Sequence, residues 1–185
     1  MNSLENWFCA SKMWRSLTEQ KWLPVALEGT NLGEHVLEVG AGPGAATNAL
    51  AARARRVTSL EYSHKFCVDL REKAGAASVV QGDASSLPFK DQTFSSAIAV
   101  LVLHHLRSPE AQDRAFAEIH RVLEPGGVFL ALEIDDSWLA RVLHIRSTFV
   151  PVAPDPLNRR LLLAGFSNAQ ITNRSGGFRL RAERV

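Results

Sequence analysis

Hydrophobic and polar positions follow two repeating patterns through the middle of the chain. Short apolar runs rich in β-branched residues predict strands, whereas stretches with an apolar position every three or four residues predict helices. The strand-like runs lie at 36–39, 56–61, 78–81, 94–103 and 128–134, and we expect the run at 78–81 to be buried. Helices are predicted at 45–54, after Ser63, and at 109–123. This alternation is typical of an α/β fold with a parallel sheet.

The C-terminal part of the chain follows a different pattern. Residues 137–165 are mainly helical in pattern but are interrupted by three prolines, so two helical pieces are expected there. The segments 168–173 and 178–184 flank Ser175-Gly176-Gly177, and apolar residues alternate with polar ones in the second segment. This arrangement predicts an antiparallel hairpin that closes one edge of the sheet.

Residues 1–30 hold three of the four tryptophans, Trp7, Trp14 and Trp22. Their spacing is compatible with one or two amphipathic helices that end near Pro24. We expect this segment to pack an apolar stripe on the domain. A lid over a ligand cleft is the alternative, because aromatic side chains serve both purposes.

Length and composition fit one globular domain, with 1–33 as a helical cap and 34–185 as the core. The chain has 185 residues, of which 46% are hydrophobic, and no run approaches the ~20 apolar residues of a membrane span. Cys9 and Cys67 form no disulfide or metal spacing, which favours a cytoplasmic location. A net charge of +2 argues against a nucleic-acid partner, and the C-terminal arginines are interpreted as a solvated face. The oligomeric state stays open.

A glycine-rich turn directly follows the first predicted strand, at Gly40, Gly42 and Gly44. Glycine allows unusual backbone angles and lets a nucleotide-like ligand lie against the backbone, at the carboxyl edge of the sheet. The turn also fits the looser dinucleotide pattern Gly-x-Gly-x-x-Ala, and Glu61 follows at a spacing typical of a ribose-binding acid. This motif alone leaves the cofactor undecided.

The remaining motifs distinguish between the cofactors. Five strands and a terminal hairpin differ from the two parallel halves of a nicotinamide-binding domain. Over roughly 34–184 the chain resembles the class I S-adenosylmethionine-dependent methyltransferases, particularly the small-molecule type 11 group. The segments that carry the resemblance are Glu38–Gly44, Glu61, Gly82-Asp83-Ala84, Leu103-His104-His105-Leu106, Leu123–Gly127 and Gly165-Phe166. The resemblance implies a Rossmann-like, mostly parallel seven-stranded sheet with an antiparallel C-terminal hairpin strand.

The resemblance also implies the cofactor, S-adenosylmethionine, and its product, S-adenosylhomocysteine. The segment from Glu38 to Gly44 would lie beneath the methionine part, and Glu61 would accept hydrogen bonds from the ribose hydroxyls. Asp83 and the backbone of Ala84 would read the adenine edge, although a turn role for Asp83 is the alternative. The cofactor-binding residues implied in this way are Glu38, Gly40, Ala41, Gly42, Gly44, Glu61, Tyr62, Asp83, Ala84 and Val100.

The expected reaction is in-line transfer of a methyl group to a small-molecule acceptor, which needs alignment rather than a catalytic triad. His104 is the candidate general base, although orienting the loop is the favoured alternative, and His105 should point elsewhere. No metal is expected, because the other histidines show no ligand spacing. Two further functions stay open, a catalytically silent S-adenosylmethionine-binding protein and a nicotinamide-dependent oxidoreductase.

The motifs do not cover residues 1–30 and 137–156, and we expect these two segments to form the acceptor pocket. Leu139, Ile145 and Phe149 would make it apolar, and Arg141 or Arg146 would meet an anionic group. One departure from the family pattern is Ser95, where relatives often carry the Asp that helps hold the glycine loop or strand end.

Overall fold

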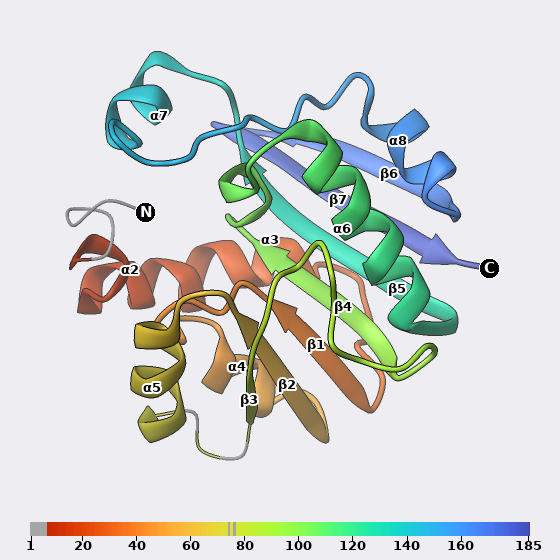
Figure 1. Cartoon of the computed structure of the whole chain (residues 1–185), viewed down its shortest axis with the longest axis horizontal. Helices are drawn as coiled ribbons and strands as arrows, with labels where there is room; N and C mark the ends of the chain where they lie inside the picture. The colour runs from red at the N-terminus through yellow and green to blue at the C-terminus, as the bar shows by residue number, and fades with distance from the viewer. Residues whose placement is uncertain (1–6, 74, 76) are drawn as a thin grey trace.

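Seven strands form one twisted sheet in the computed structural model of the chain, which describes residues 7–73, 75 and 77–185 (Figure 1). The strand order is β3-β2-β1-β4-β5-β7-β6. β1 to β5 are parallel, and β7 runs antiparallel to both β5 and β6. The predicted sheet and its terminal hairpin are therefore confirmed. The strands are β1 (His35–Val39), β2 (Arg56–Glu61), β3 (Ser78–Gln81), β4 (Phe94–Val100), β5 (Leu123–Ile134), β6 (Phe166–Arg174) and β7 (Gly177–Arg184).

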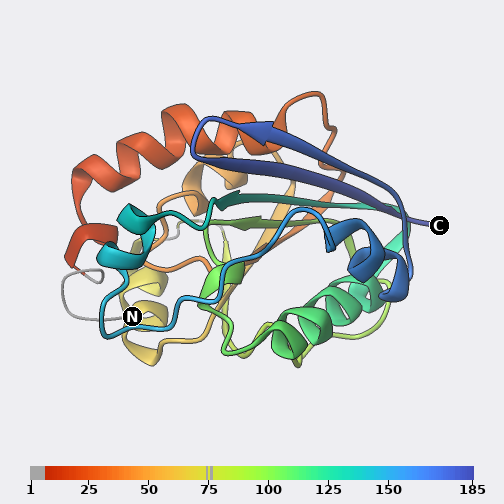
Figure 2. The same cartoon turned by 90° about the horizontal axis from the view of Figure 1, so that it is seen from above.

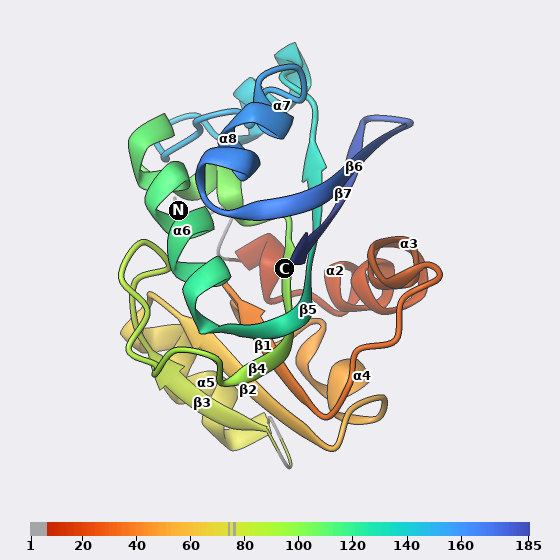
Figure 3. The same cartoon turned by 90° about the vertical axis from the view of Figure 1, so that its right-hand side faces the viewer.

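Helices cover both faces of this sheet. Seen along the sheet in Figure 3, α2, α3 and α4 lie on one face and α6 and α8 lie on the other, and Figure 2 shows the same layers from above. The two helical pieces predicted within 137–165 are present as α7 and α8. The helical elements are α2 (Lys12–Leu17), η1 (Thr18–Trp22), α3 (Leu23–Leu27), α4 (Thr47–Ala51), α5 (His64–Lys73), η2 (Leu103–His105), α6 (Pro109–Val122), α7 (Trp138–Leu143) and α8 (Leu157–Leu163).

The N-terminal helical segment does not end near Pro24, as the sequence suggested, but continues to Leu27. Thr18–Trp22 forms a π-helical turn, so Pro24 falls in the first turn of the next helix. A proline is tolerated there because its missing N–H has no obligatory partner. The expected packing is confirmed for α3, because Leu23 and Ala26 are completely buried against the sheet. Residues 1–6 of this predicted cap lie outside the described residues.

β3 is not the buried strand that its apolar run suggested. Ser78 and Gln81 are exposed, and Val79 and Val80 are half-buried. The cause is position, because β3 pairs with β2 alone and forms one edge of the sheet. Apolar composition cannot distinguish an edge strand from a central one.

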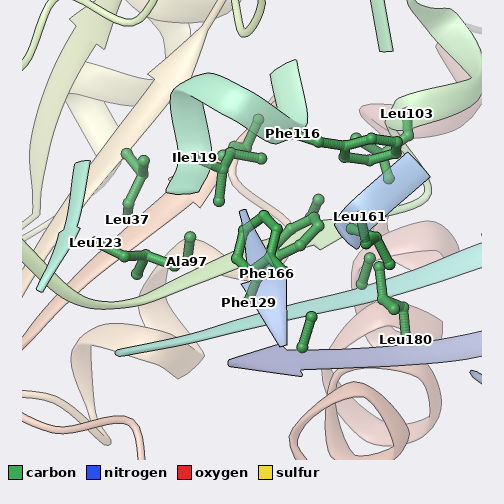
Figure 4. Packing of buried hydrophobic residues seen from close by; sticks show 14 of the residues in the cluster. Leu37, Ala97, Leu103, Phe116, Ile119, Leu123, Phe129, Leu161, Phe166 and Leu180 are labelled. Carbon is green, nitrogen blue, oxygen red and sulfur yellow. The ribbon is translucent and has the colours of Figure 1, made fainter. Parts of the chain in front are cut away.

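The larger core lies between the sheet and the layer of α6 and α8 (Figure 4). Phe129 on β5 and Phe166 on β6 pack with their ring centroids 5.8 Å apart, and the ring centroid of Phe116 on α6 lies 6.3 Å from that of Phe129. Burial of each such ring contributes about 1.5–3 kcal/mol. A second core joins the other face to α3 and α4, with Val36 and Leu130 on the sheet and Leu50 on α4. Packing on both faces explains why the central strands are buried along almost their whole length.

The C-terminal arginines form the solvated face that the sequence suggested only in part, because Arg174 is exposed but Arg179 and Arg184 are not. Arg179 is buried, and its guanidinium donates to the backbone carbonyls of Ala26 and Glu28 at 3.2 and 2.6 Å. Arg184 donates to the carbonyls of His120 and Arg121 at 2.9 and 2.8 Å. Carbonyls at a helix C-terminus favour a cation, so these arginines hold α3 and α6 to the hairpin.

Among the described helices, none combines the length and the apolar character needed to cross a lipid bilayer.

Candidate active site

A pocket of about 580 Å³ opens at the carboxyl ends of β1, β2 and β4, the sheet edge where the sequence placed a ligand. Its inner wall consists of the turns that follow these strands and β3, and includes nine of the ten predicted cofactor residues. Its outer wall comes from the N-terminal helices and from the segment around η2. The outer-wall residues are Cys9, Trp14, Thr18, His105, Leu106, Arg107, Ser108, Ala111, Arg114 and Thr148.

The glycine turn after β1 presents bare backbone to this pocket. Gly40 has a φ of +69°, and a Cβ on it would lie 2.0 Å from Cγ2 of Val102. Gly42 has a φ of +55°, and a Cβ there would meet no heavy atom within 4 Å. Gly40 therefore allows close packing against the loop after β4, whereas Gly42 leaves an open face that a ligand can approach.

Gly44 is the one predicted cofactor residue that does not line the pocket. A Cβ on Gly44 would lie 2.4 Å from Cδ1 of Leu70 on α5. This glycine therefore allows the start of the helical turn after β1 to pack against α5.

Glu61 at the end of β2 lies in the pocket wall and is 8% exposed. Its Oε2 accepts from the backbone N–H of Gly42 at 2.8 Å, and its Oε1 accepts from the N–H of Ser63 at 2.7 Å. Burial raises the pKa of Glu61, and the two backbone donors counteract this shift. Because a carboxylate oxygen has more than one lone pair, both oxygens keep the capacity to bind a vicinal diol.

Glu38 on β1 has a different environment. Its Oε2 accepts from the hydroxyls of Thr47 on α4 and Ser59 on β2, both at 2.6 Å. Burial raises the pKa of this carboxyl group, and the two hydroxyl donors oppose the rise. Glu38 therefore ties two strands to the helix that follows the glycine turn.

Asp83 and Ala84 line the pocket beyond β3. Oδ1 of Asp83 accepts from the backbone N–H of Ser85 at 2.8 Å and from its hydroxyl at 2.7 Å. The Asp83 side chain therefore caps a turn, as the alternative interpretation supposed. This geometry is also compatible with the cofactor role, in which Oδ2 would be the acceptor for an amino group.

Tyr62 and Arg107 meet at the pocket from opposite walls. The Arg107 guanidinium donates to the Tyr62 hydroxyl at 2.9 Å and lies 5.8 Å from the ring centroid. Tyr62 was a predicted cofactor residue, but Arg107 and Arg114 were not predicted. The sequence marked them only by their position, with Arg107 directly after the Leu103–Leu106 motif and Arg114 on the helix that follows.

The adjacent histidines are arranged opposite to expectation. His105 lines the pocket, whereas His104 is 2% exposed and is not part of the pocket wall. Nδ1 of His104 lies 2.6 Å from Oε2 of Glu133, whose Oε1 accepts from the N–H groups of Val102 and Leu103. This arrangement holds the loop after β4 to β5, which supports an orienting role for His104.

Most of the segment 137–156, which we expected to form part of the acceptor pocket, lies outside the pocket wall. Of the described residues in that segment, Thr148 alone lines the pocket. Leu139 and Ile145 are 52% and 59% exposed and lie outside it, and Arg141 pairs with Asp136 at 2.6 Å. The segment after β4 supplies most of the outer wall, because η2 and the start of α6 turn back over the sheet edge.

The Ser95 hydroxyl forms hydrogen bonds at the start of β1. Its hydroxyl accepts from the N–H of His35 at 3.0 Å and lies 2.8 Å from the carbonyl oxygen of Leu32. The departure from the family's Asp therefore leaves the amino end of β1 anchored to β4.

The family model for a methyltransferase domain, type 11, matches residues 37–131, from β1 into β5. The chain belongs to this methyltransferase family. The matched range contains the glycine turn, Glu61, Asp83 and both histidines of the η2 turn. The cofactor of this chain is S-adenosylmethionine, which rules out the nicotinamide alternative.

Relatives and solved structures agree with this assignment. The chain is 36% identical over 127 residues to a demethylmenaquinone methyltransferase of Thermobifida fusca, covering 66% of this chain and 50% of that protein. It is 30% identical over 131 residues to the ubiquinone/menaquinone biosynthesis C-methyltransferase UbiE of Rubrivivax gelatinosus, covering 69% and 51%. The chain thus spans about half the length of these relatives. A SAM-dependent methyltransferase from Aquifex aeolicus shares the fold over 100% of both chains, with a TM-score of 0.79 and 16% identity.

Proposed function

We propose that this methyltransferase transfers the methyl group of S-adenosylmethionine to a ring carbon of a small aromatic acceptor of the hydroquinone type. The observation that carries the proposal is the pocket itself, in which the cofactor residues form the inner wall and a short aromatic and cationic wall faces them. Its volume of about 580 Å³ lies within the usual range for small-molecule sites. The names of two quinone-pathway relatives support this acceptor class.

The residues that fit the cofactor come from three strand ends. Glu61 would bind the ribose hydroxyls, Asp83 and the Ala84 backbone would bind the adenine edge, and the open face at Gly42 would lie against the amino-acid part. Bound S-adenosylmethionine supplies a methyl group that is already electrophilic. The task of the protein is therefore to fix the acceptor in line with it, and orientation of this kind contributes about 7–11 kcal/mol in well-aligned reactions.

The outer wall suits a flat ring with an ionised hydroxyl. Trp14 and Leu106 provide apolar surface, and Arg107 and Arg114 place two guanidinium groups at the same wall. A hydroquinone ring becomes a better carbon nucleophile when it loses a proton, and nearby cations stabilise the resulting anion. Burial, together with the neighbouring His104, lowers the pKa of His105 to about 3, so this histidine is a weak base. Stabilisation by the arginines is therefore the stronger source of activation.

The test is an assay of the purified protein with S-adenosylmethionine and a short-chain demethylated naphthohydroquinone, with the product identified by mass spectrometry. We expect methylation on carbon, together with binding of S-adenosylhomocysteine by calorimetry. Arg114→Gln should lose about tenfold or more in kcat/KM, whereas Arg53→Gln, in the turn after α4 and outside the pocket wall, should match the wild type. Cofactor binding without methylation of the hydroquinone would overturn the acceptor class.

A further inference from the structure

Three histidines that are distant in the sequence meet beside the pocket. His104 and His105 belong to η2, and His144 follows α7. One ligand-type nitrogen from each ring lies within 4.8 Å of those of the other two. The ring centroids of His104 are 4.2 Å from His105 and 5.0 Å from His144. Such spacing brings three imidazoles close enough to share one ion.

The hydrogen bonds at Nδ1 define which nitrogen of each ring can act as a ligand. Nδ1 of His105 lies 3.2 Å from the carbonyl oxygen of Thr148, and Nδ1 of His144 lies 2.7 Å from that of Ala140. A carbonyl oxygen only accepts, so both Nδ1 atoms carry a proton. The nitrogen of these two rings that can bind a metal is then Nε2.

His104 has the same arrangement with a carboxylate. Its Nδ1 lies 2.6 Å from Oε2 of the fully buried Glu133. A carboxylate or carbonyl on the far nitrogen is the usual outer partner of a metal-binding histidine, since it fixes the ring and increases the basicity of the ligating nitrogen. All three rings therefore have the outer partner that metal-binding imidazoles commonly show.

Packing holds the rings in place and leaves the cluster reachable. Phe149 stacks on His144 with centroids 4.6 Å apart and meets His104 edge-on at 5.5 Å. His104 is buried, but His105 and His144 are only half-buried, and His105 lines the pocket. An ion could therefore enter from the pocket side without opening the core.

We propose that His104, His105 and His144 form a binding site for a divalent transition-metal ion of the zinc class, at the outer wall of the pocket. Three imidazole ligands favour zinc, cobalt or nickel over magnesium and calcium, which prefer oxygen ligands. A three-histidine site leaves a position for water or another oxygen ligand. The ion would join η2 to the segment after α7 and thereby order this wall. The proposal is independent of the acceptor class.

Metal binding itself is the direct test. The full chain, freed of metal and kept reduced, is titrated with ZnCl₂ by calorimetry, with His144→Gln as the variant and His64→Gln as the matched control. His64 is exposed on α5 and contacts Gln81, away from the cluster. We expect one zinc ion per wild-type and His64→Gln chain, and at least about tenfold weaker binding by His144→Gln. Equal affinity of all three proteins would overturn the site.

Cobalt provides a second readout that identifies the ligands. CoCl₂ should give weak visible absorption bands without a thiolate charge-transfer band, because the three proposed ligands are nitrogens. A thiolate band, or a spectrum unchanged in His144→Gln, would contradict the site. Thermal unfolding separates binding from damage to the fold, since ZnCl₂ should raise the Tm of the wild type and of His64→Gln but not that of His144→Gln. Should His144→Gln fail to fold, His105→Gln takes its place with the same expected results.

Discussion

The carboxylate of Glu61 accepts a hydrogen bond from the backbone N–H of Gly42 over 2.8 Å, which links the end of β2 to the turn after β1. Ser63 donates to the other oxygen, so the carboxylate has a fixed orientation before any ligand arrives. Preorganisation of this kind reduces the cost of binding, because the side chain loses little further freedom. The buried acid at this position is therefore suited to recognise a diol rather than to serve as a flexible surface charge.

Replacement of Glu61 by Gln should weaken S-adenosylhomocysteine binding by about 10- to 100-fold. The amide keeps the shape but removes the charge and one acceptor, and a hydrogen bond to a charged group contributes about 1.5–3 kcal/mol. Isothermal titration calorimetry measures the change. Glu34→Gln is the control, because Glu34 is an exposed acid that pairs with Arg55 outside the pocket. Unchanged affinity in Glu61→Gln would remove this residue from the cofactor site.

The two roles of Asp83 can be separated by a pair of variants. Asp83→Ala removes both oxygens, whereas Ser85→Ala removes the hydroxyl that donates to Oδ1 and leaves the carboxylate intact. If Oδ2 reads the adenine edge, Asp83→Ala should weaken S-adenosylhomocysteine binding about tenfold, and Ser85→Ala should change it less than threefold. Equal losses in the two variants would show that Asp83 acts through the turn alone.

Local sequence patterns were sufficient for much of this fold. Gly40 and Gly42 marked the turn after β1 because a positive φ and a close backbone approach leave few alternatives to glycine. The helix predicted at 109–123 from its early proline and apolar stripe is present as Pro109–Val122, and Ser108 accepts from the N–H of Ala111 at its start. These signals are local, so one sequence is enough to read them.

The features that could not be predicted from the sequence depend on contacts between distant residues. His144 lies 39 residues after His105, and no spacing rule connects them (144 − 105 = 39). Arg179 alternates with apolar neighbours, as a surface residue would. Its guanidinium nevertheless donates to the backbone carbonyl of Ala26 in α3, which lies 153 positions earlier in the chain. Arg107 became a pocket residue only through the path of the chain after β4. Tertiary contacts of this kind cannot be derived from periodicity.

Gly40→Ala should destabilise the protein by about 2–5 kcal/mol. The new Cβ would lie 2.0 Å from Cγ2 of Val102, and the backbone has a φ of +69°. Overpacking costs about 1–3 kcal/mol, and the left-handed conformation adds about 1–2 kcal/mol for an L-residue. Urea unfolding gives the free energy.

Two further variants test the cause of that destabilisation. Gly126 has a φ of +79°, but a Cβ on it would meet no heavy atom within 4 Å, so Gly126→Ala should show the backbone cost alone. In the Val102→Ala background, Gly40→Ala should cost less than in the wild type, because the clashing methyl group is gone. An undiminished cost in that background would contradict the steric explanation.

Glu38 should make stability depend on pH in a direction opposite to that of most acids. Burial raises its pKa above the ordinary value of 4.5, so the folded protein holds this proton more tightly than the unfolded chain does. The associated stabilisation is fully present below pH 4.5 and is lost as the pH rises through the raised folded pKa.

Glu38→Gln retains an oxygen acceptor for the hydroxyls of Thr47 and Ser59 but cannot ionise. The free energy of unfolding of the wild type, relative to Glu38→Gln, should therefore fall between pH 4.5 and neutrality, as measured by urea unfolding across that range. Glu34→Gln, at an exposed acid, should run parallel to the wild type, and a constant wild-type minus Glu38→Gln difference would show that the hydroxyl donors cancel the effect of burial.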